Sequence, residues 1–418
     1  MIRLMTCLAL ALAVGAGLPD ARAQNAGTPG TIVPAAPITF TAFMQTLAQR
    51  ARAEGVSDAT IHAVIDGLTY DPDVVHHDRA QPGVSPAYAP RFEPYRRTHV
   101  DAGRIARGRA IYAASGPLIA GIEARYGVPG PIVLAIWGHE TNFGSFTGNY
   151  DLPRAIASLA YEGRRRTLFS GEFIALLKMI DRGVPRAKLQ GSWAGAFGNP
   201  QFLPSVYLRV AQDADGDGLA DIWTNRADTL ASIANYFRDA GWRRGEPWGI
   251  GVTIPAGFDR TAMANRLVSP RCPQVFMRHS RWRTIAEWRA AGILPARAAW
   301  PDDRMQATLF EPDGPGHPAW LLTGNYRVIL DYNCSNYYAL SVGLLADEIQ
   351  YVAAGATPFF FRKLKVNSLI QHSSVPTVVE DQHFAPTRHL QPKPPQPGML
   401  LFKGARRLCG IETKTARV

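Results

Sequence analysis

The sequence predicts a mainly α-helical protein of the α+β class, in which a small β-rich segment interrupts a series of helices. Two observations predict this class. Apolar side chains recur at the three- and four-residue spacing of helices over most of the chain between residues 40 and 351. Runs typical of strands are confined to residues 248–330, and the chain contains no internal repeat. We therefore expect a helical domain with a β-rich insertion at about residues 246–331.

Capping residues and helix breakers place the individual elements. Ser57 stands before Asp58 at an N-cap position, and Pro131 suits a first helical turn because its missing N–H needs no partner there. The Pro-rich residues 70–92 are expected to wrap the surface without regular structure. Helices are expected at residues 40–53, 58–68, 94–126, 131–140, 152–160, 171–181, 204–212, 227–240 and 337–351. Strands are expected at residues 248–255, 306–310, 319–322 and 326–330.

The N-terminus has the parts of a secretory signal. Arg3 supplies the positive charge, residues 4–17 form an apolar run too short to span a membrane, and Ala21 and Ala23 are small residues at the cleavage positions. Cys7 lies inside the apolar run, which does not fit a lipoprotein cysteine. We expect residues 1–23 to be a signal peptide, 24–37 a flexible leader, 38–351 the folded domain and 352–418 a tail, in an exported protein without a transmembrane segment.

The positive charge is concentrated near the C-terminus. The formal net charge is +11, and residues 357–418 hold ten Lys or Arg against three Asp or Glu. The folded domain is therefore close to neutral, which argues against a nucleic-acid partner. The tail either contacts anionic surfaces of the cell envelope or is a solvated extension.

Removal of the signal leaves three cysteines. Export permits a disulfide, and Cys272 with Cys334 is the preferred pair because Cys409 belongs to the tail. Buried free thiols are the alternative. The three thiols do not have the spacing of a metal site.

A glutamate at the end of an apolar helix is the candidate catalytic group. Glu140 follows Ile136 by four residues and Trp137 by three, so the three side chains share one helix face. Burial raises the pKa of a carboxyl, and a protonated Glu acts as a general acid on a leaving oxygen, as glycoside cleavage requires. The alternative is a helix-end Glu that faces water. His139 with Glu140 resembles the start of a zinc-binding helix, but Phe143 occupies the position of the second His, so the spacing excludes zinc.

A segment rich in small residues, 192–205, is a candidate binding loop. Its glycines allow the backbone to approach a ligand closely, and Gln201 offers both a donor and an acceptor to an N-acetyl group. Ser192 belongs to the same segment, and Tyr207 is expected to add an aromatic platform. A turn between two core helices is the alternative.

Acidic residues at alternate positions form the first half of an EF-hand-like loop. Asp213, Asp215 and Asp217 supply hard oxygen ligands, and Leu219 offers its carbonyl. Thr224 stands where a bidentate Glu is usual, and Asp228 closes the shell if the loop is longer. We expect a structural calcium ion of modest affinity, with an Asp/Gly-rich surface turn as the alternative.

A third cluster, residues 332–338, is expected to join the last strand to the last helix. Tyr332 and Tyr338 offer aromatic faces to sugar rings, and Asn333 offers an amide to their polar substituents. Aromatic core packing with an Asn or Ser helix cap explains the cluster equally well.

Together these motifs resemble the lytic transglycosylase B family of murein-degrading bacterial enzymes, over residues 40–351. The resembling segments are 78–82, 137–144, 159–165, 191–196, 201–205, 233–237, 321–326 and 332–333. The resemblance implies a lysozyme-like helical core with an N-terminal α subdomain, the EF-hand-like loop and a β-rich subdomain, in a periplasmic protein. It implies cleavage of the β-1,4 bond between N-acetylmuramic acid and N-acetylglucosamine.

The resemblance also implies roles for individual residues. Glu140 matches the family's single acid/base, Gln201, Tyr332, Asn333 and Tyr338 match its glycan-contacting positions, and the aspartate loop matches its calcium site, although the spacing to Asp228 is one residue longer. Catalysis is expected to need no cofactor. With one carboxylate, the C6 hydroxyl of muramic acid closes a 1,6-anhydro ring in place of water. A lysozyme-type hydrolase and a non-catalytic glycan-binding scaffold are the alternatives. Glycan strands are the expected partner, and other cell-wall proteins are candidate partners.

Overall fold

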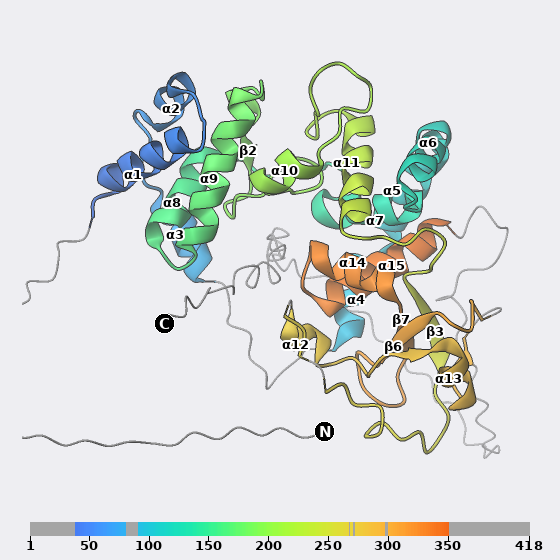
Figure 1. Ribbon diagram of the computed structural model, residues 1–418. Coiled ribbons are helices and arrows are strands. Elements are labelled where there is room, and N and C mark those ends of the chain that lie inside the picture. Colours follow the sequence, from blue (N-terminus) through green and yellow to red (C-terminus); the bar gives the residue numbers. More distant parts are fainter. Residues whose placement is uncertain (1–37, 81–90, 267, 271, 297–299, 351–418) are drawn as a thin grey trace, which may run out of the picture. The chain divides into compact units, whose positions relative to one another are not determined.

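The computed structural model describes residues 38–80, 91–266, 268–270, 272–296 and 300–350 (Figure 1). The expected signal peptide, leader and basic tail lie outside these residues. Helices predominate in the described part of the chain, and its largest sheet has five strands. The predicted mainly α class with a small β component is therefore confirmed.

The first helices form an N-terminal α subdomain. Helices α1 (Phe40–Ala53) and α2 (Asp58–Ile65) pack against α9 (Arg166–Asp181), and α3 (Pro72–Arg79) packs against α8 (Leu152–Glu162). Ser57 caps α2 as predicted, since its hydroxyl accepts the Thr60 N–H at 3.2 Å. Helix α3 corrects the expectation that residues 70–92 lack regular structure. Asp71 caps it and Pro72 opens it, a helix start that the Pro-rich composition obscured.

The stretch predicted as helical at 94–126 is divided into three helices. They are α4 (Phe92–His99), α5 (Ala102–Ala114) and α6 (Gly116–Tyr126). Helix α7 (Gly130–Thr141) follows, and all twelve of its residues are buried. Helices α5, α11 (Arg226–Asp239) and α15 (Asn336–Gln350) pack against it, although they come from distant parts of the chain (Figure 1). The helix that carries Glu140 is thus enclosed by the helical core.

Short elements connect the helices on either side of the 192–205 segment. Strand β1 (Tyr150–Asp151) pairs antiparallel with β2 (Gln190–Gly191), which follows the short helix η1 (Arg186–Lys188). Helix α10 (Pro204–Val210) begins where the segment ends. The pairing brings the segment back toward the loop that follows α7, because a Cβ on Gly148 would lie 2.2 Å from the Gly191 backbone. This close approach is possible only with glycine at position 148.

The β-rich subdomain is an antiparallel sheet with its own small core. In sheet order its strands are β4 (Arg283–Thr284), β6 (Gln306–Phe310), β7 (Ala319–Leu322), β3 (Gly249–Thr253) and β5 (Leu294–Pro295). Val252 pairs with Ala319 and Thr308 with Leu322. Trp288, on α13 (Ile285–Ala290), fills this core and donates its indole N–H to the Ala307 carbonyl at 3.0 Å.

The strand predicted at residues 326–330 is wrong, because these residues belong to α14 (Gly324–Tyr332). Thr323 caps this helix by accepting the Asn325 N–H. The Asn325 side chain donates to the Arg243 and Glu246 carbonyls at 2.9 and 2.8 Å, which fixes the start of the helix against the chain after α11. The apolar run that read as a strand is the buried face of a helix, an ambiguity that short apolar runs carry. Residues 332–338 therefore join two helices.

The disulfide predicted between Cys272 and Cys334 is confirmed. Cys272 directly precedes α12 (Pro273–Phe276), and Cys334 follows α14. The bond therefore ties the β-rich subdomain to the chain segment that carries Tyr332 and Asn333.

Within the described ranges, no single helix combines the length and apolar character needed to cross a membrane. Helices α6 and α7 reach this length and apolar character only when they are taken as a pair, and the chain bends by 106° between them.

Candidate active site

The chain after Glu140 turns sharply and ends α7. Asn142, Phe143 and Gly144 all have positive φ, of 52°, 59° and 80°. This is costly for the two residues with side chains. The turn folds the Phe143 ring back onto α7, where a Cβ on Gly138 would lie only 2.7 Å from it. Gly138 thus allows the helix to stop one residue after Glu140.

Glu140 is a buried carboxyl with one strong hydrogen bond. Its side chain is 5% exposed, and the Tyr338 hydroxyl donates to Oε1 at 2.5 Å. Burial raises the pKa of the Glu140 carboxyl from 4.5 to about 8, and the Tyr338 hydrogen bond opposes this shift only in part. The carboxyl is therefore protonated at neutral pH, so the alternative of a helix-end Glu in water is wrong.

Three tyrosines surround this carboxyl. Burial raises the pKa values of Tyr95, Tyr332 and Tyr338, and the Glu140 charge raises them further. The Tyr332 hydroxyl donates to the Pro200 carbonyl, which connects the end of α14 to the residue before Gln201. All three tyrosines stay neutral hydrogen-bonding groups over the physiological pH range.

Polar side chains behind Glu140 hold Tyr338 in place. His139 Nδ1 lies 2.9 Å from the Ala135 carbonyl, so this nitrogen carries the proton, and Nε2 lies 2.8 Å from the Ser341 hydroxyl oxygen. The Ser341 hydroxyl also lies 2.8 Å from the Tyr338 carbonyl and bonds Tyr95. Both ring nitrogens of His139 thus have partners within the protein.

Gln201 presents an amide oxygen from a strained backbone position. Its φ is 51°, and its amide nitrogen donates to the Thr147 carbonyl at 3.0 Å and to the Gly198 carbonyl at 2.9 Å. These bonds fix which end of the amide is the nitrogen. They use both donors and leave the oxygen as an acceptor for a ligand N–H.

Asn333 carries a buried amide oxygen with no hydrogen-bond partner among the described residues. Such an orphaned acceptor is costly unless a ligand or water satisfies it. It follows Tyr332 directly, and Tyr332 and Tyr338 both lie close enough to Glu140 to feel its charge.

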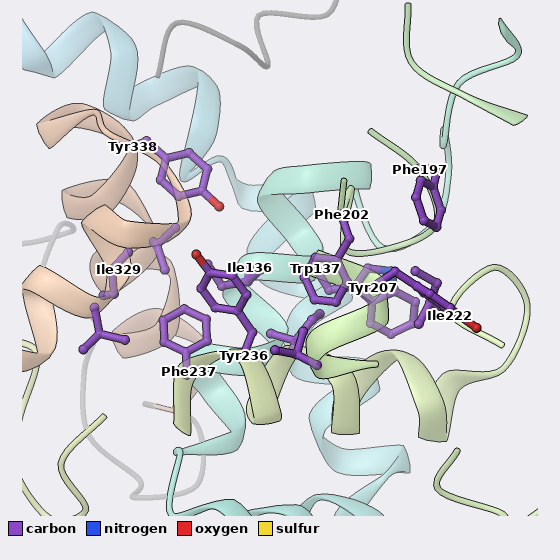
Figure 2. Packing of buried hydrophobic residues seen from close by; sticks show 14 of the residues in the cluster. Ile136, Trp137, Phe197, Phe202, Tyr207, Ile222, Tyr236, Phe237, Ile329 and Tyr338 are labelled. Atoms are coloured by element: carbon purple, nitrogen blue, oxygen red, sulfur yellow. The ribbon is translucent and has the colours of Figure 1, made fainter. Parts of the chain in front are cut away.

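The structure places Ser192 and Tyr207 in supporting positions. Ser192 is fully buried, and its hydroxyl accepts the Ala196 N–H at 3.1 Å, which shapes the turn. The buried Tyr207 donates to the Ala220 carbonyl at 3.0 Å and packs 5.9 Å from the Phe197 ring. Figure 2 shows it beside Ile222, across Trp137 from Tyr338. Tyr207 therefore supports the aspartate loop rather than offering an aromatic platform to sugars.

The aspartate loop gathers three exposed carboxylates. Ligand oxygens of Asp213, Asp215 and Asp217 lie within 4.8 Å of one another. Backbone N–H groups of the loop bond Asp213, the Gly218 N–H most strongly, and lower the pKa of its carboxyl. A set of hard carboxylate oxygens at this spacing fits calcium. The Leu219 carbonyl accepts the Asp221 N–H at 2.8 Å and keeps a second lone pair for an ion.

Asp228 does not join this group. It is fully buried, and its two oxygens accept the backbone N–H groups of Ala214 and Asp221, both at 2.7 Å. These bonds brace the two ends of the loop against α11. The expectation that Asp228 closes a metal shell is therefore not supported by its contacts.

Asn199 links the aspartate loop to the helix of Glu140, and the sequence analysis did not single it out. Its N–H donates to the Ile222 carbonyl at 2.8 Å, and its side-chain oxygen accepts the Trp137 indole N–H at 3.0 Å. Its carbonyl accepts the Thr141 hydroxyl at 3.0 Å. The dense 192–205 segment contained the signal for Asn199. Tyr95 and Ser341 were missed because they stand on ordinary-looking helices.

Comparisons with known proteins agree with this arrangement. The family model described as "Transglycosylase SLT domain" matches residues 39–347. SltB3 from Pseudomonas aeruginosa, solved in complex with NAG-anhNAM-pentapeptide, is 37% identical, with a TM-score of 0.66 over 74% of this chain and 79% of that one. Escherichia coli Slt35, solved in complex with calcium, is 25% identical, with a TM-score of 0.58 over 74% of this chain and 93% of that one.

A curated relative extends the comparison. The chain is 34% identical over 227 residues to "Membrane-bound lytic murein transglycosylase B" of Escherichia coli K12, which covers 54% of this chain and 58% of the relative. The chain thus spans less than two thirds of that relative's length. The helical core around the buried Glu140 defines a lysozyme-like protein. The chain belongs to the Transglycosylase SLT domain family, and its relatives place it with the lytic transglycosylases of type B.

Proposed function

We propose that the protein is a peptidoglycan lytic transglycosylase, with Glu140 as its general acid and base. The observation that carries the proposal is one buried carboxyl with a pKa of about 8, held by a tyrosine hydroxyl. The causes of this shift are burial and Tyr338, and no neighbouring carboxylate of the described residues contributes. A hydrolase needs a second carboxylate to activate water or to form a glycosyl-enzyme.

The first step is breakage of the bond between C1 of N-acetylmuramic acid and O4 of N-acetylglucosamine. The protonated Glu140 donates its proton to O4, which leaves with the bonding electrons. The N-acetyl carbonyl oxygen of the muramic acid attacks C1 and forms an oxazolinium ion. The Tyr338 hydroxyl, already at Oε1, stabilises the carboxylate that Glu140 becomes. The free oxygen of Gln201 and the amide of Asn333 are proposed to hold N-acetyl groups, since both have an unused acceptor.

The second step closes the ring. The Glu140 carboxylate takes the proton of the C6 hydroxyl, whose oxygen attacks C1 and displaces the N-acetyl oxygen. A 1,6-anhydro ring forms, the acetamido group is restored, and Glu140 is protonated for the next cycle. The tethered hydroxyl competes well with water because its effective concentration is high.

The aspartate loop is proposed to hold a structural calcium ion. Asp213, Asp215, Asp217 and the Leu219 carbonyl would supply the ligands, and the ion would rigidify the loop that Asn199 connects to α7. It takes no part in the proton transfers. The Slt35 structure with calcium supports this proposal.

We also propose that the protein acts in the periplasm, as the N-terminal sequence indicates. The Cys272–Cys334 disulfide supports an oxidising compartment. Glycan strands are the proposed substrate, since SltB3 was solved with glycan–peptide fragments of this type.

The test is a digest of purified murein sacculi by the protein and by Glu140→Gln, with products read by mass spectrometry. We expect muropeptides one water lighter than reducing muropeptides, and a rate loss of about 10³-fold or more in the variant. Reducing ends alone would mean a hydrolase. Sacculi that bind the protein and stay intact would mean a glycan-binding scaffold.

A further inference from the structure

A cavity of about 770 Å³ lies on the outer face of α14. Gly324, Arg327, Val328 and Asp331 line it at the spacing of one helix face. The opposite wall includes Phe276 of α12 and residues that precede β4 and β6. Neither Glu140 nor the tyrosines around it are among the described lining residues. The cavity is thus a separate feature between the helical core and the β-rich subdomain.

Arg327 is the distinctive side chain of this cavity. Its guanidinium lies 3.5 Å from the Phe276 ring centroid and 4.8 Å from that of Trp282. The described residues place no carboxylate within ion-pair distance of it. Burial lowers the pKa of Arg327 to about 10, so it stays charged at neutral pH. The aromatic rings cover the faces of the guanidinium, so its N–H groups at the edge remain available to an anion. Arg binds a carboxylate through two hydrogen bonds along this edge.

Two further arginines line the cavity, and both have acidic partners. Arg243 lies 3.5 Å from Glu246, and Arg304 lies 3.1 Å from Asp302, so these two arginines have partners. Asp331 also lines the cavity, four residues after Arg327 on α14. Both paired arginines are more exposed than Arg327, which places them at the rim. Arg327 is therefore the arginine of the described lining that has no carboxylate within ion-pair distance, and it is the group that can bind an entering anion.

The walls are fixed relative to one another before any ligand binds. The Cys272–Cys334 disulfide joins the residue before α12 to the segment after α14. The Arg243 N–H donates to the Asn325 side chain at 2.8 Å, which holds the rim against the start of α14. Preorganised walls lower the entropy cost of binding.

The cavity and Tyr332 of the Glu140 site share helix α14. Arg327 precedes Tyr332 by five residues on α14, which corresponds to about 7.5 Å along the helix axis. A five-residue peptide spans at most about 17 Å when extended. The peptide on a muramic acid held beside Tyr332 is therefore long enough to cover this axial separation and to pass around the helix.

We propose that this cavity is a subsite for a carboxylate of the peptide stem carried by muramic acid, with Arg327 as its anchor. The inference rests on the proposed function, because it takes the glycan strand as substrate. The subsite makes peptide-bearing strands better substrates than bare strands, through binding rather than through the proton transfers at Glu140.

The test compares the full chain with Arg327→Gln and Arg327→Lys on two substrates, peptide-bearing strands and strands stripped of peptide by an amidase. Arg289→Gln is the matched control, because Arg289 is an exposed arginine of the same subdomain that pairs with Asp303 at 3.0 Å. We expect kcat/KM on peptide-bearing strands to fall at least fivefold more than on stripped strands in Arg327→Gln. Lys keeps the charge but loses the planar fork, so we expect an intermediate loss. Equal losses on both substrates, or no loss on either, would overturn the proposal.

A calorimetric titration separates this proposal from the proposed function. The probes are NAG-NAM-pentapeptide, the free pentapeptide, the bare disaccharide and acetate, each with Glu140→Gln alone and with Glu140→Gln combined with Arg327→Gln. We expect the free pentapeptide to bind the double variant at least fivefold more weakly than it binds Glu140→Gln. The bare disaccharide should bind both proteins equally. Arg243→Gln, at the exposed rim, is expected to weaken binding by about twofold. Acetate that binds as well as the pentapeptide would mean a general anion site and would overturn the assignment. Strands that stay uncut while the pentapeptide binds at Arg327 would refute the proposed function alone.

Discussion

The helix of Glu140 and the aspartate loop carry the same functional group in opposite environments. Glu140 is buried among apolar side chains, and the pKa of its carboxyl rises to about 8. Asp221, in the loop, also loses some hydration, but hydrogen bonds from Thr224, Lys188 and backbone N–H groups outweigh this and lower its pKa to about 2. One carboxyl is thus a proton donor at neutral pH, and the other is a permanent anion.

Backbone geometry explains the difference. The N–H groups of α7 are used within the helix, so Glu140 receives a single hydrogen bond, from Tyr338. The aspartate loop turns at Gly216 and Gly218, where φ is 80° and 97°, and its free N–H groups point at carboxylates. The buried helix end thus favours a protonated carboxyl, and the glycine-rich loop favours carboxylates that can bind a cation, although both regions use the same functional group.

Removal of the single donor to Glu140 is expected to have the largest effect. Tyr338→Phe should lower kcat on murein by about 10²–10³-fold, the cost of losing a catalytic hydrogen-bond donor. It should also raise the pKa of Glu140, since this hydrogen bond lowers it. Initial rates against pH measure both effects. Tyr126→Phe is the matched control, because the Tyr126 hydroxyl bonds Gln212 at 3.2 Å on another helix. Equal rates in the two variants would show that the contact does not serve catalysis.

The buried carboxyl should also reduce stability as pH rises. Its folded pKa of about 8 exceeds the unfolded value of 4.5. The stabilisation by proton binding is therefore complete below pH 4.5 and is lost as pH rises through 8. Glu140→Gln removes this dependence and should gain up to about 3 kcal/mol over the native chain at pH 7. Urea unfolding of both proteins at pH 5, 7 and 8.5 measures it. A difference that stays constant with pH would mean that the carboxyl is not buried as a neutral acid.

The loop should respond to cations instead of protons. Calcium at one hundred times its Kd should stabilise the protein by about 2.7 kcal/mol, and a chelator should reverse the gain. Asp217→Asn should abolish this response, because Asp217 belongs to the group of three carboxylates. Asp259→Asn, on an exposed turn of the β-rich subdomain, is the control. Melting curves of the native chain and the two variants, with and without calcium, measure this response. A melting temperature that calcium leaves unchanged would contradict the calcium proposal.

Substitution of Tyr207 should have the smallest effect. It tests whether this residue supports the aspartate loop or contacts the glycan. Tyr207→Phe loses the hydrogen bond to Ala220 and should destabilise the protein by about 1 kcal/mol. It should leave KM for murein within about twofold, because Tyr207 packs against the loop and not at the glycan site. Denaturant unfolding and murein digestion measure the two quantities. A large rise in KM with unchanged stability would restore the sugar-platform interpretation.

The sequence by itself determined the helix of Glu140, the Ser57 cap and the cysteine pair, because proline, capping residues and a scarcity of thiols act locally. It also distinguished two kinds of acidic group, because Glu140 has apolar neighbours and Asp213 stands in a glycine-rich loop. It mistook residues 326–330 for a strand, since a short apolar run fits either structure until its partners are known.

Only the tertiary structure decided which side chains meet. Tyr95 and Tyr338 approach Glu140 from other helices of the chain, Ser341 contacts the neighbouring His139, and Asn199 joins the aspartate loop to α7. No local pattern encodes these contacts. Burial depends on the packing of several helices at once, so the pKa of Glu140, and with it the chemistry of the site, is a property of the assembled core.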